Sequence, residues 1–348
     1  MDQSFSLSLN GSCGDAQPAT SPDLDDVMIS VVISNNGIAT TVSKDNNNWY
    51  NYKNKEWANV VLVNSSSRNK YLNTSGVEVN EDDILAYYVW IPRYSYRIPT
   101  VDAPTIKGNN VSLTNQNIST QFATSQKLGT STYGSTSKVD SHMMKNSEWG
   151  AVAYLSHSKY GTNKEIRINN YRNNSKTLTG CGANTENESS SNTCGIIYGK
   201  ATSYPQSTTG NITGIFDMPG GAWEYVMGYY SGASTTWGAN SNNNAAGFSS
   251  KPASNYFDDY ISENPSTACN GEICYGNALS ETSNWYGDFS SFVNANNPWF
   301  KRGGNNNNGA NAAPSTSTAT TVLPTTTVVS VRLFPSLESS DFVLYYGY

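Results

Sequence analysis

The sequence predicts an α+β fold with short strands, few helices and long polar loops. Two apolar runs, VMISVVIS at 27–34 and NVVLVNS at 59–65, are rich in β-branched residues and separated by Asn-rich turns, which indicates strands. The run DILAYYVWIPRYSYRI at 83–98 has the strongest strand pattern in the chain. Only 146–157 has a convincing helical pattern. Because polar stretches join these elements, the loops are expected to carry the function.

Two details qualify the strand predictions. The segment NNNWYNYKNKEWANVV at 46–61 alternates aromatic and polar residues, as a half-buried hairpin does. Pro92 lies inside the strongest strand run. Since proline cannot donate a ladder hydrogen bond, it predicts an edge strand or a bulge at that point.

The helix predicted at 146–157 begins with residues that suit a helix start. Asn146 or Ser147 can cap it, and Glu148 suits the positive end of the helix dipole. Its apolar face is expected to comprise Trp149, Val152, Ala153 and Leu155. At its other end, we interpret His157 as a residue that interacts with the helix dipole rather than as a catalytic base.

The composition argues against several classes of protein. The 348 residues carry a net charge of −6, and the 21 basic residues are spread along the chain. No basic stripe is present, so nucleic acid is not expected as a partner. No apolar run reaches about 18 residues and no signal peptide is recognisable, so no membrane span is expected. His142, His157 and the five Cys are too far apart for a zinc motif.

Four segments in order resemble a known family. They are YVWIPRYSY (88–96), NSEWGAVAYL (146–155), GIFDMPGGAWEYVMG (214–228) and WFKRGG (299–304). The family is the formylglycine-generating, sulfatase-modifying-factor type of C-type lectin fold, and the resemblance covers about 80–335. Within it, the chain is most similar to gut-bacterial surface proteins of the kind diversified by retroelements.

The resemblance implies a domain organisation. Residues 1–26 are expected to form a tail or linker and residues 27–80 a small β-rich region. A C-type-lectin-like domain follows at 81–335, with a variable ligand-binding segment near 299–331. Residues 336–348 are expected to form an irregular tail.

In that group of proteins the residues after R-G-G face the ligand. Asparagine carries a donor and an acceptor on one short side chain, which suits such a surface; the alternative is a disordered Asn-rich loop. The implied ligand-facing residues are Trp299, Asn305, Asn306, Asn307, Asn308 and Asn311. The implied scaffold residues are Trp149, Asp217, Gly220, Trp223, Arg302, Gly303 and Gly304. Glu224 could pair with Arg302.

The resemblance also predicts that the chain is not an enzyme. The family's enzymes bind copper through two cysteines placed after R-G-G, and this chain has no Cys beyond Cys274. Asp82 and Asp83 are interpreted as a solvated turn. We therefore expect a non-catalytic adhesin-like protein with a protein or glycan ligand and no cofactor, apart from a structural calcium that the fold accommodates. The alternatives are a formylglycine-generating type of enzyme and a structural pilus or surface component.

The cysteines indicate an oxidising compartment. Cys269 and Cys274 flank a turn signal, and Cys181 and Cys194 enclose a polar loop. Disulfides within or between these pairs would stabilise the loops. Cys13 is left over, and reduced thiols are the alternative. An extracellular or cell-surface location is the expectation.

The C-terminal sequence departs from the family pattern. The Thr-rich run from 315 to 327 is interrupted by proline, where the family has an aromatic-rich run closing on S-F-R. Thr codons begin with AC, so a reading frame one base earlier can encode Tyr there. We therefore hypothesise that residues from about 312 onward are a frameshifted reading with a loosely packed end. The coding DNA decides this hypothesis.

Overall fold

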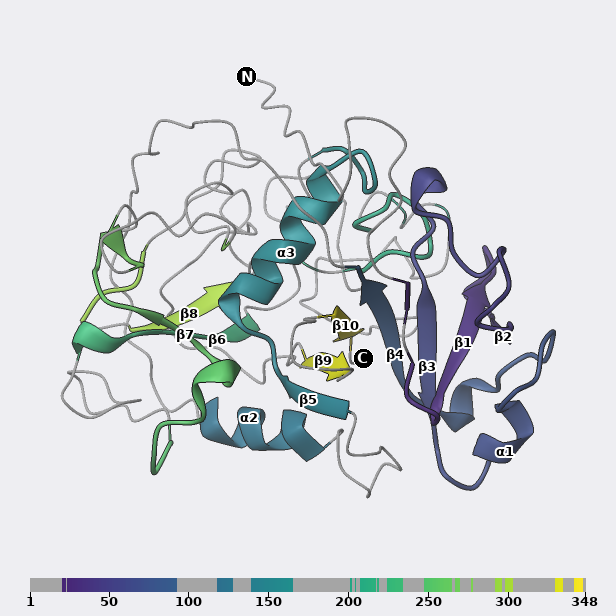
Figure 1. Ribbon diagram of the computed structural model, residues 1–348, viewed down its shortest axis with the longest axis horizontal. Helices are drawn as coiled ribbons and strands as arrows, with labels where there is room; N and C mark the ends of the chain where they lie inside the picture. The colour runs from purple at the N-terminus through teal and green to yellow at the C-terminus, as the bar shows by residue number, and fades with distance from the viewer. Residues whose placement is uncertain are drawn as a thin grey trace, which may run out of the picture.

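The chain is described in a computed structural model. The described residues are 21–22, 24–92, 118–127, 139–164, 201, 204, 207–216, 218, 224–233, 247–264, 267–269, 277, 292–295, 298–302, 329–333 and 341–346. Two β-sheets and three helices make up the regular structure of this part (Figure 1). It is a mixed arrangement with short strands and few helices, in agreement with the predicted α+β class.

The larger sheet has seven antiparallel strands in the order β2-β1-β3-β4-β10-β9-β5. Its strands are β1 (Met28–Ile33), β2 (Ala39–Thr41), β3 (Asn59–Val63), β4 (Ile84–Ile91), β5 (Val139–Met143), β9 (Val329–Leu333) and β10 (Asp341–Tyr346). β3 is buried along its whole length. That burial explains why its sequence, NVVLV, is continuously apolar rather than alternating.

The smaller sheet has three strands in the order β7-β6-β8. These are β6 (Glu224–Tyr230), β7 (Asp258–Tyr260) and β8 (Trp299–Arg302). β7 runs parallel to β6, and β8 runs antiparallel to it. The amide of Met227 in β6 donates to the carbonyl of Met144, just after β5, over 2.8 Å. This bond connects the smaller sheet to the chain that leaves the larger one.

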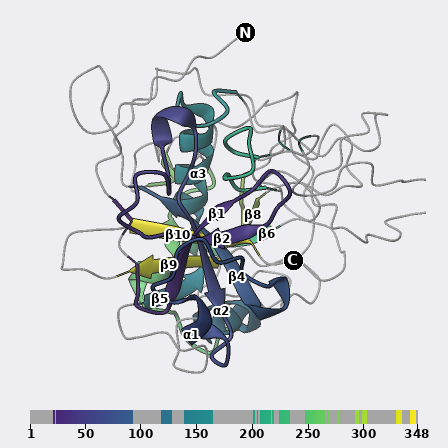
Figure 2. The same ribbon diagram turned by 90° about the vertical axis from the view of Figure 1, so that its right-hand side faces the viewer.

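In the view of Figure 1, helix α3 lies between the smaller sheet and strands β1 to β4 of the larger one; Figure 2 shows the same helix from the side of the larger sheet. The helices are α1 (Arg68–Tyr71), α2 (Ile118–Lys127) and α3 (Asn146–His157). Short 3-10 turns occur at Tyr52–Asn54, Glu81–Asp83, Ser231–Ala233 and Ser254–Tyr256. α2 packs against β5. None of the helices in the described part has the length and hydropathy needed to cross a membrane.

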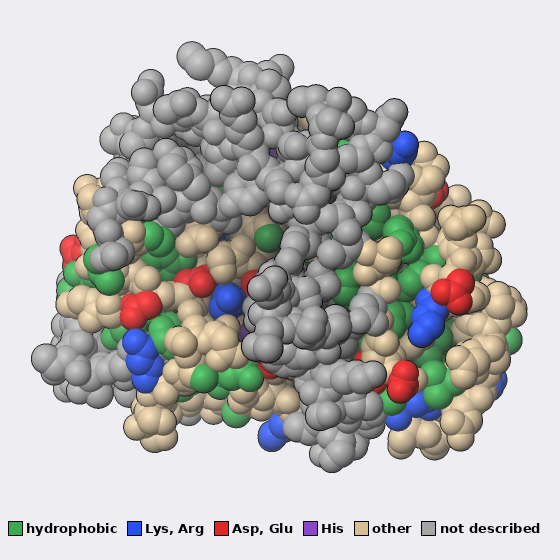
Figure 3. All heavy atoms as spheres, viewed as in Figure 1, with side chains coloured by type: hydrophobic (Ala, Val, Ile, Leu, Met, Phe, Trp, Pro, Cys, Tyr) green, Lys and Arg blue, Asp and Glu red, His purple; other side chains and the backbone are tan. Residues whose placement is uncertain are grey.

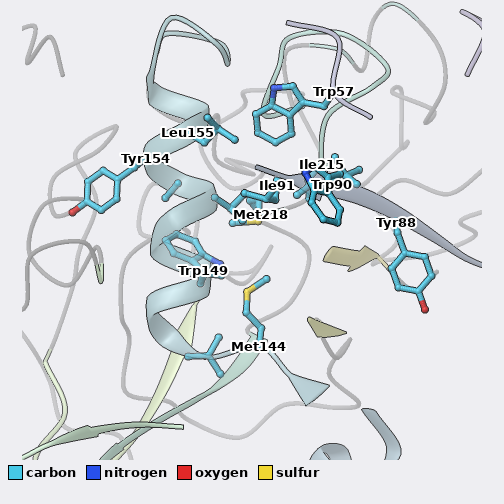
Figure 4. Packing of buried hydrophobic residues seen from close by; sticks show 14 of the residues in the cluster. Trp57, Tyr88, Trp90, Ile91, Met144, Trp149, Tyr154, Leu155, Ile215 and Met218 are labelled. Atoms are coloured by element: carbon cyan, nitrogen blue, oxygen red, sulfur yellow. The ribbon is translucent and has the colours of Figure 1, made fainter. Parts of the chain in front are cut away.

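The main hydrophobic core forms between α3 and the larger sheet. Trp149 and Leu155 project from α3 toward Trp57 and Trp90 (Figure 4). All four side chains have at most 1% of their surface exposed. The indole N–H of Trp57 donates to the carbonyl of Tyr160 over 2.9 Å, which removes the cost of burying that polar group. The aromatic residues of this polar chain thus supply most of the bulk of its core.

Several predicted elements agree with the structure. α3 has the predicted bounds, and its predicted apolar face is buried. The residue at its N-cap is Lys145, whereas Asn146 or Ser147 was expected there. In the aromatic segment 46–61, a single bridge between Asn51 and Glu56 replaces the expected hairpin.

The prediction from Pro92 is wrong. β4 lies between β3 and β10, so it is an interior strand. The last strand residue is Ile91, and Pro92 follows directly after it. The proline therefore ends the strand, which is the other way in which a missing ladder donor can be tolerated.

The expected domain boundary near residue 80 does not separate two sheets. Residues 27–80 contribute β1, β2 and β3, which continue through β4 into the rest of the larger sheet. Residues 336–348, expected as an irregular tail, contain β10. Its backbone pairs with β4 and β9. The reading frame itself stays a question for the coding DNA.

We predict that Trp149→Ala lowers the free energy of unfolding by about 3–5 kcal/mol, because it opens a cavity in the main core. Leu85→Ala is the control, since Leu85 is 41% exposed, and it should change stability by less than about 0.5 kcal/mol. Urea unfolding followed by tryptophan fluorescence measures both. Equal losses in the two variants would contradict this assignment of the core.

Candidate functional site

The predicted ligand-facing residues meet the described structure at β8. Trp299 was expected to face a ligand, but it is 1% exposed, so this prediction is wrong. Its ring stacks on Phe248 with a centroid distance of 5.7 Å and packs against Tyr229 at 5.0 Å. These rings belong to a second core between the smaller sheet and α2. Strand alternation directs Trp299 into that core.

Of the remaining predicted residues, some belong to the described part of the structure and others lie outside it. Trp149 and Arg302, predicted as scaffold, are buried at 0% exposure. Residues predicted as ligand-facing that lie outside the described residues are Asn305, Asn306, Asn307, Asn308 and Asn311. Scaffold residues that lie outside them are Asp217, Gly220, Trp223, Gly303 and Gly304. Glu224 lies opposite Arg302 in the β6–β8 ladder.

Arg302, the last residue of β8, is held on three sides. Its Nε donates to Oδ1 of Asn146 over 2.7 Å, and its Nη2 donates to the carbonyl of Asn277 over 2.5 Å. The guanidinium carbon lies 4.6 Å from the centre of the Trp149 ring. A planar, permanently charged donor group suits this combination of carbonyl oxygens and an aromatic face. The end of β8 is therefore fixed to the start of α3.

The same contacts close into a ring of four residues, which we call the Arg302 ring (Arg302, Asn146, Tyr260 and Asn277); Asn277 takes part through both its backbone carbonyl and its side chain. Asn146 Nδ2 donates to the Tyr260 hydroxyl over 2.8 Å, and Asn277 Nδ2 donates to the same oxygen over 3.2 Å. Burial raises the pKa of Tyr260 well above its ordinary value, so the phenol stays protonated. The Arg302 ring joins α3, β7, β8 and the loop residue Asn277.

The start of α3 is capped from β7 as well. Asp258 accepts from the amide of Ser147 over 2.6 Å and from its hydroxyl over 3.1 Å. Glu148 accepts from the amide of Lys145 over 2.9 Å. Both carboxylates lie at the positive end of the helix dipole, where negative charge is favoured. The sequence predicted this role for Glu148 but not for Asp258, which is about 110 residues away.

A second polar cluster lies between β5 and α3. Nε2 of His142 lies 3.1 Å from Glu148 Oε1, and Nδ1 lies 3.6 Å from Asp140 Oδ2. Burial alone would lower the pKa of His142, but the charges of Glu148 and Asp140 outweigh it and raise that pKa to about 9. Burial alone would raise the pKa of Glu148, but His142 and Lys145 lower it to about 2. The cluster therefore holds a charged pair at neutral pH.

This cluster was missed by sequence reasoning, which treated His142 only as a possible metal ligand. A signal was present: Asp140 and His142 are two residues apart in a strand and so share a face. His142 is 0% exposed. Because its two nitrogens face carboxylates inside the protein, the arrangement holds β5 against α3 rather than offering a base to solvent.

Lys301, His157 and Asp83 are three further ionisable side chains with surroundings of their own. Lys301 is 6% exposed, its Nζ lies 4.6 Å from the centre of the Tyr225 ring, and burial lowers its pKa to about 7. Burial also lowers the pKa of His157, in the last turn of α3, which favours the neutral form. Asp83 accepts from the Tyr71 hydroxyl over 2.6 Å, so the predicted solvated turn has a structural contact.

On the face shown in Figure 3, charged side chains of both signs are interspersed among polar ones in the described part. Within the described ranges, no three His, Cys, Asp or Glu side chains are arranged to hold a metal ion. Cys269 is disulfide-bonded. The other four cysteines, Cys13, Cys181, Cys194 and Cys274, lie outside the described residues.

Comparisons with protein-family models, with curated proteins and with solved structures each find no significant match.

We predict a stability maximum set in part by His142 and Glu148. The folded pKa of His142, about 9, lies above its ordinary 6.5, so its contribution is complete below pH 6.5 and is lost as the pH rises through 9. The folded pKa of Glu148, about 2, lies below its ordinary 4.5, so its contribution is lost as the pH falls through 2.

Urea unfolding at pH 6 and pH 10 tests the alkaline limb. Relative to His142→Gln, the native chain should lose on the order of 2–3 kcal/mol over this range. Parallel pH profiles for the two proteins would show that His142 is not held in its charged form.

We also predict that titration of the chain under denaturing, non-reducing conditions finds at most three free thiols, because one disulfide takes two of the five cysteines. A reduced sample is the control and should give five. Five free thiols without reductant would contradict the disulfide at Cys269.

Proposed function

We propose that this chain is a non-catalytic ligand-binding protein of C-type-lectin-like fold, in which the Asn-rich segment after β8 contacts the target. The observation that carries the proposal is the fixation of Arg302. Its guanidinium is buried and bonded to Asn146 and Asn277, so the chain leaves the smaller sheet from a rigid point. A loop that starts from a rigid scaffold is the usual arrangement of a binding site.

The composition of that segment supports a binding role. Residues 305–308 are four consecutive asparagines, and Asn311 follows shortly after. Each carries two amide donors and one carbonyl acceptor without a net charge. Such a surface can form hydrogen bonds with the hydroxyl groups of a glycan or with the backbone of a protein. We place the ligand contacts at these five residues and, after the correction above, not at Trp299.

The buried ionisable groups also favour a non-catalytic role. His142 is enclosed between Asp140 and Glu148, and Asp258 caps α3. General acid–base catalysis needs a group within reach of a bound substrate. The contacts of these residues are instead with other elements of the protein, which they hold together.

We further propose that the chain functions outside the cytoplasm, at the cell surface or as a secreted protein. The disulfide at Cys269 supports this location, because structural disulfides persist in oxidising compartments. The resemblance to proteins diversified by retroelements fits a scaffold with an exchangeable binding segment.

We predict that replacement of Asn305–Asn308 by Ala abolishes binding while the Tm changes by less than about 2 °C, since the exchanged side chains contribute to recognition rather than to the core. The measurement is the signal of the labelled protein on an array of defined oligosaccharides and immobilised glycoproteins.

The matched control replaces Asn47 and Asn48 by Ala, because both lie exposed in a turn far along the chain from β8. This variant should bind like the native protein. The proposal fails if the native chain binds nothing on the array, or if both variants keep its full binding. A large fall in Tm for the Asn305–Asn308 variant would assign the segment to the core.

A further inference from the structure

The Arg302 ring connects parts of the chain that are far apart in sequence. Asn146 is 156 residues from Arg302 and 114 residues from Tyr260, while Asn277 is 25 residues from Arg302. Neither Asn146 nor Tyr260 is adjacent in sequence to the Asn-rich segment at 305–311. Their described contacts with β8 are the hydrogen bonds that reach Arg302 through Asn146 and Asn277, and the packing of the Tyr260 ring on Phe300.

The geometry points to Asn146 and Tyr260 as positioning residues: through Arg302 they set where the segment after β8 leaves the protein, and so set its affinity for a ligand. This inference rests on the proposed function. It adds two residues to the binding apparatus that neither the sequence pattern nor contact with a ligand would identify.

The chemistry of Asn146 explains why it can hold Arg302 in one place. Its amide is used at both ends: Oδ1 accepts from Arg302 and Nδ2 donates to Tyr260. Because the guanidinium can only donate, Arg302 fixes which way the Asn146 amide is turned, and the Tyr260 hydroxyl holds the NH₂ group at the other end of that amide. Tyr260 therefore acts on Arg302 through Asn146 and, because Asn277 Nδ2 also donates to its hydroxyl, through Asn277.

The surroundings make this orientation costly to lose. Arg302, Asn146 and Tyr260 are each 0% exposed, so a group that loses its partner cannot turn to water. The ring of Tyr260 packs against Phe300 of β8 at a centroid distance of 4.8 Å. Removal of the hydroxyl alone leaves that packing in place. Tyr260→Phe thus separates positioning from support of the core.

The closing experiment measures amide hydrogen exchange in peptides that cover β8 and the residues after it. Tyr260→Phe should increase exchange there about fivefold or more, in line with the loss of the two hydrogen bonds that the hydroxyl accepts from Asn146 and Asn277. Exchange in β1 and β3 should stay unchanged. Tyr71→Phe is the matched control, because it removes an equally buried tyrosine's hydroxyl, bonded to Asp83, at the far end of the larger sheet. It should leave exchange at β8 unaltered.

A second pair of variants provides the rescue. Asn146→Leu removes both contacts and should accelerate exchange at β8 more than Tyr260→Phe does. Asn146→Asp keeps an acceptor for Arg302 and can accept the proton of Tyr260, so its exchange should lie near that of the native chain. If Asn146→Leu does not fold, the comparison of Tyr260→Phe with Tyr71→Phe still decides the question.

Unchanged exchange at β8 in Tyr260→Phe, equal acceleration by Tyr71→Phe, or no rescue by Asn146→Asp would each overturn the inference. Binding to the array of oligosaccharides and glycoproteins is measured on the same variants. Faster exchange with undiminished binding would also overturn it. Because exchange needs no ligand, a native chain that binds nothing on the array contradicts the proposed function and leaves the exchange result interpretable.

Discussion

The burial of the Arg302 guanidinium is the constraint on which the smaller sheet depends. A charge removed from water must be given donors and acceptors at short range, or the fold loses several kcal/mol. Here Asn146, Asn277 and the face of Trp149 meet that need together. Their positions in turn require α3, β7 and β8 to meet at one place. The buried polar contacts around Arg302 thus help to determine how α3, β7 and β8 are placed, together with the apolar core.

Helix α3 contacts both sheets and so connects them. Its Trp149 and Leu155 pack into the main core, and its first turn is bonded to the smaller sheet through Asn146 and Ser147. His142 and Glu148 add an ion pair between the same helix and β5. An element that serves two sheets needs different chemistry along its length. The sequence NSEWGAVAYLSH shows this, with polar residues in its first turn and apolar residues after it.

The parts of the fold that depend on local pattern could be predicted from the sequence. The bounds of α3 follow from helical periodicity, the positions of β1 and β3 follow from their apolar, β-branched runs, and Trp149 was correctly placed in the core. The errors concern contacts between distant residues. Trp299 was assigned to the surface because the family resemblance places ligand contacts nearby, but its side chain alternates into the second core. The partners of Asn146 and the location of β10 beside β4 depend on pairing across more than 100 residues, for which local pattern holds no information.

The order of the larger sheet has a consequence for how the chain is made. β10 and β9 lie between β4 and β5, so the strands at residues 84–91 and 139–143 are not joined directly. On the ribosome, β1 to β4 can pair as soon as they emerge, but β4 then presents an open edge for as long as it takes to synthesise some 250 more residues. At about 5–20 residues per second this interval lasts on the order of 10–50 seconds. During it, the unpaired edge of β4 is the place where a nascent chain would associate with another, and a chaperone that covers exposed strand edges would protect it there.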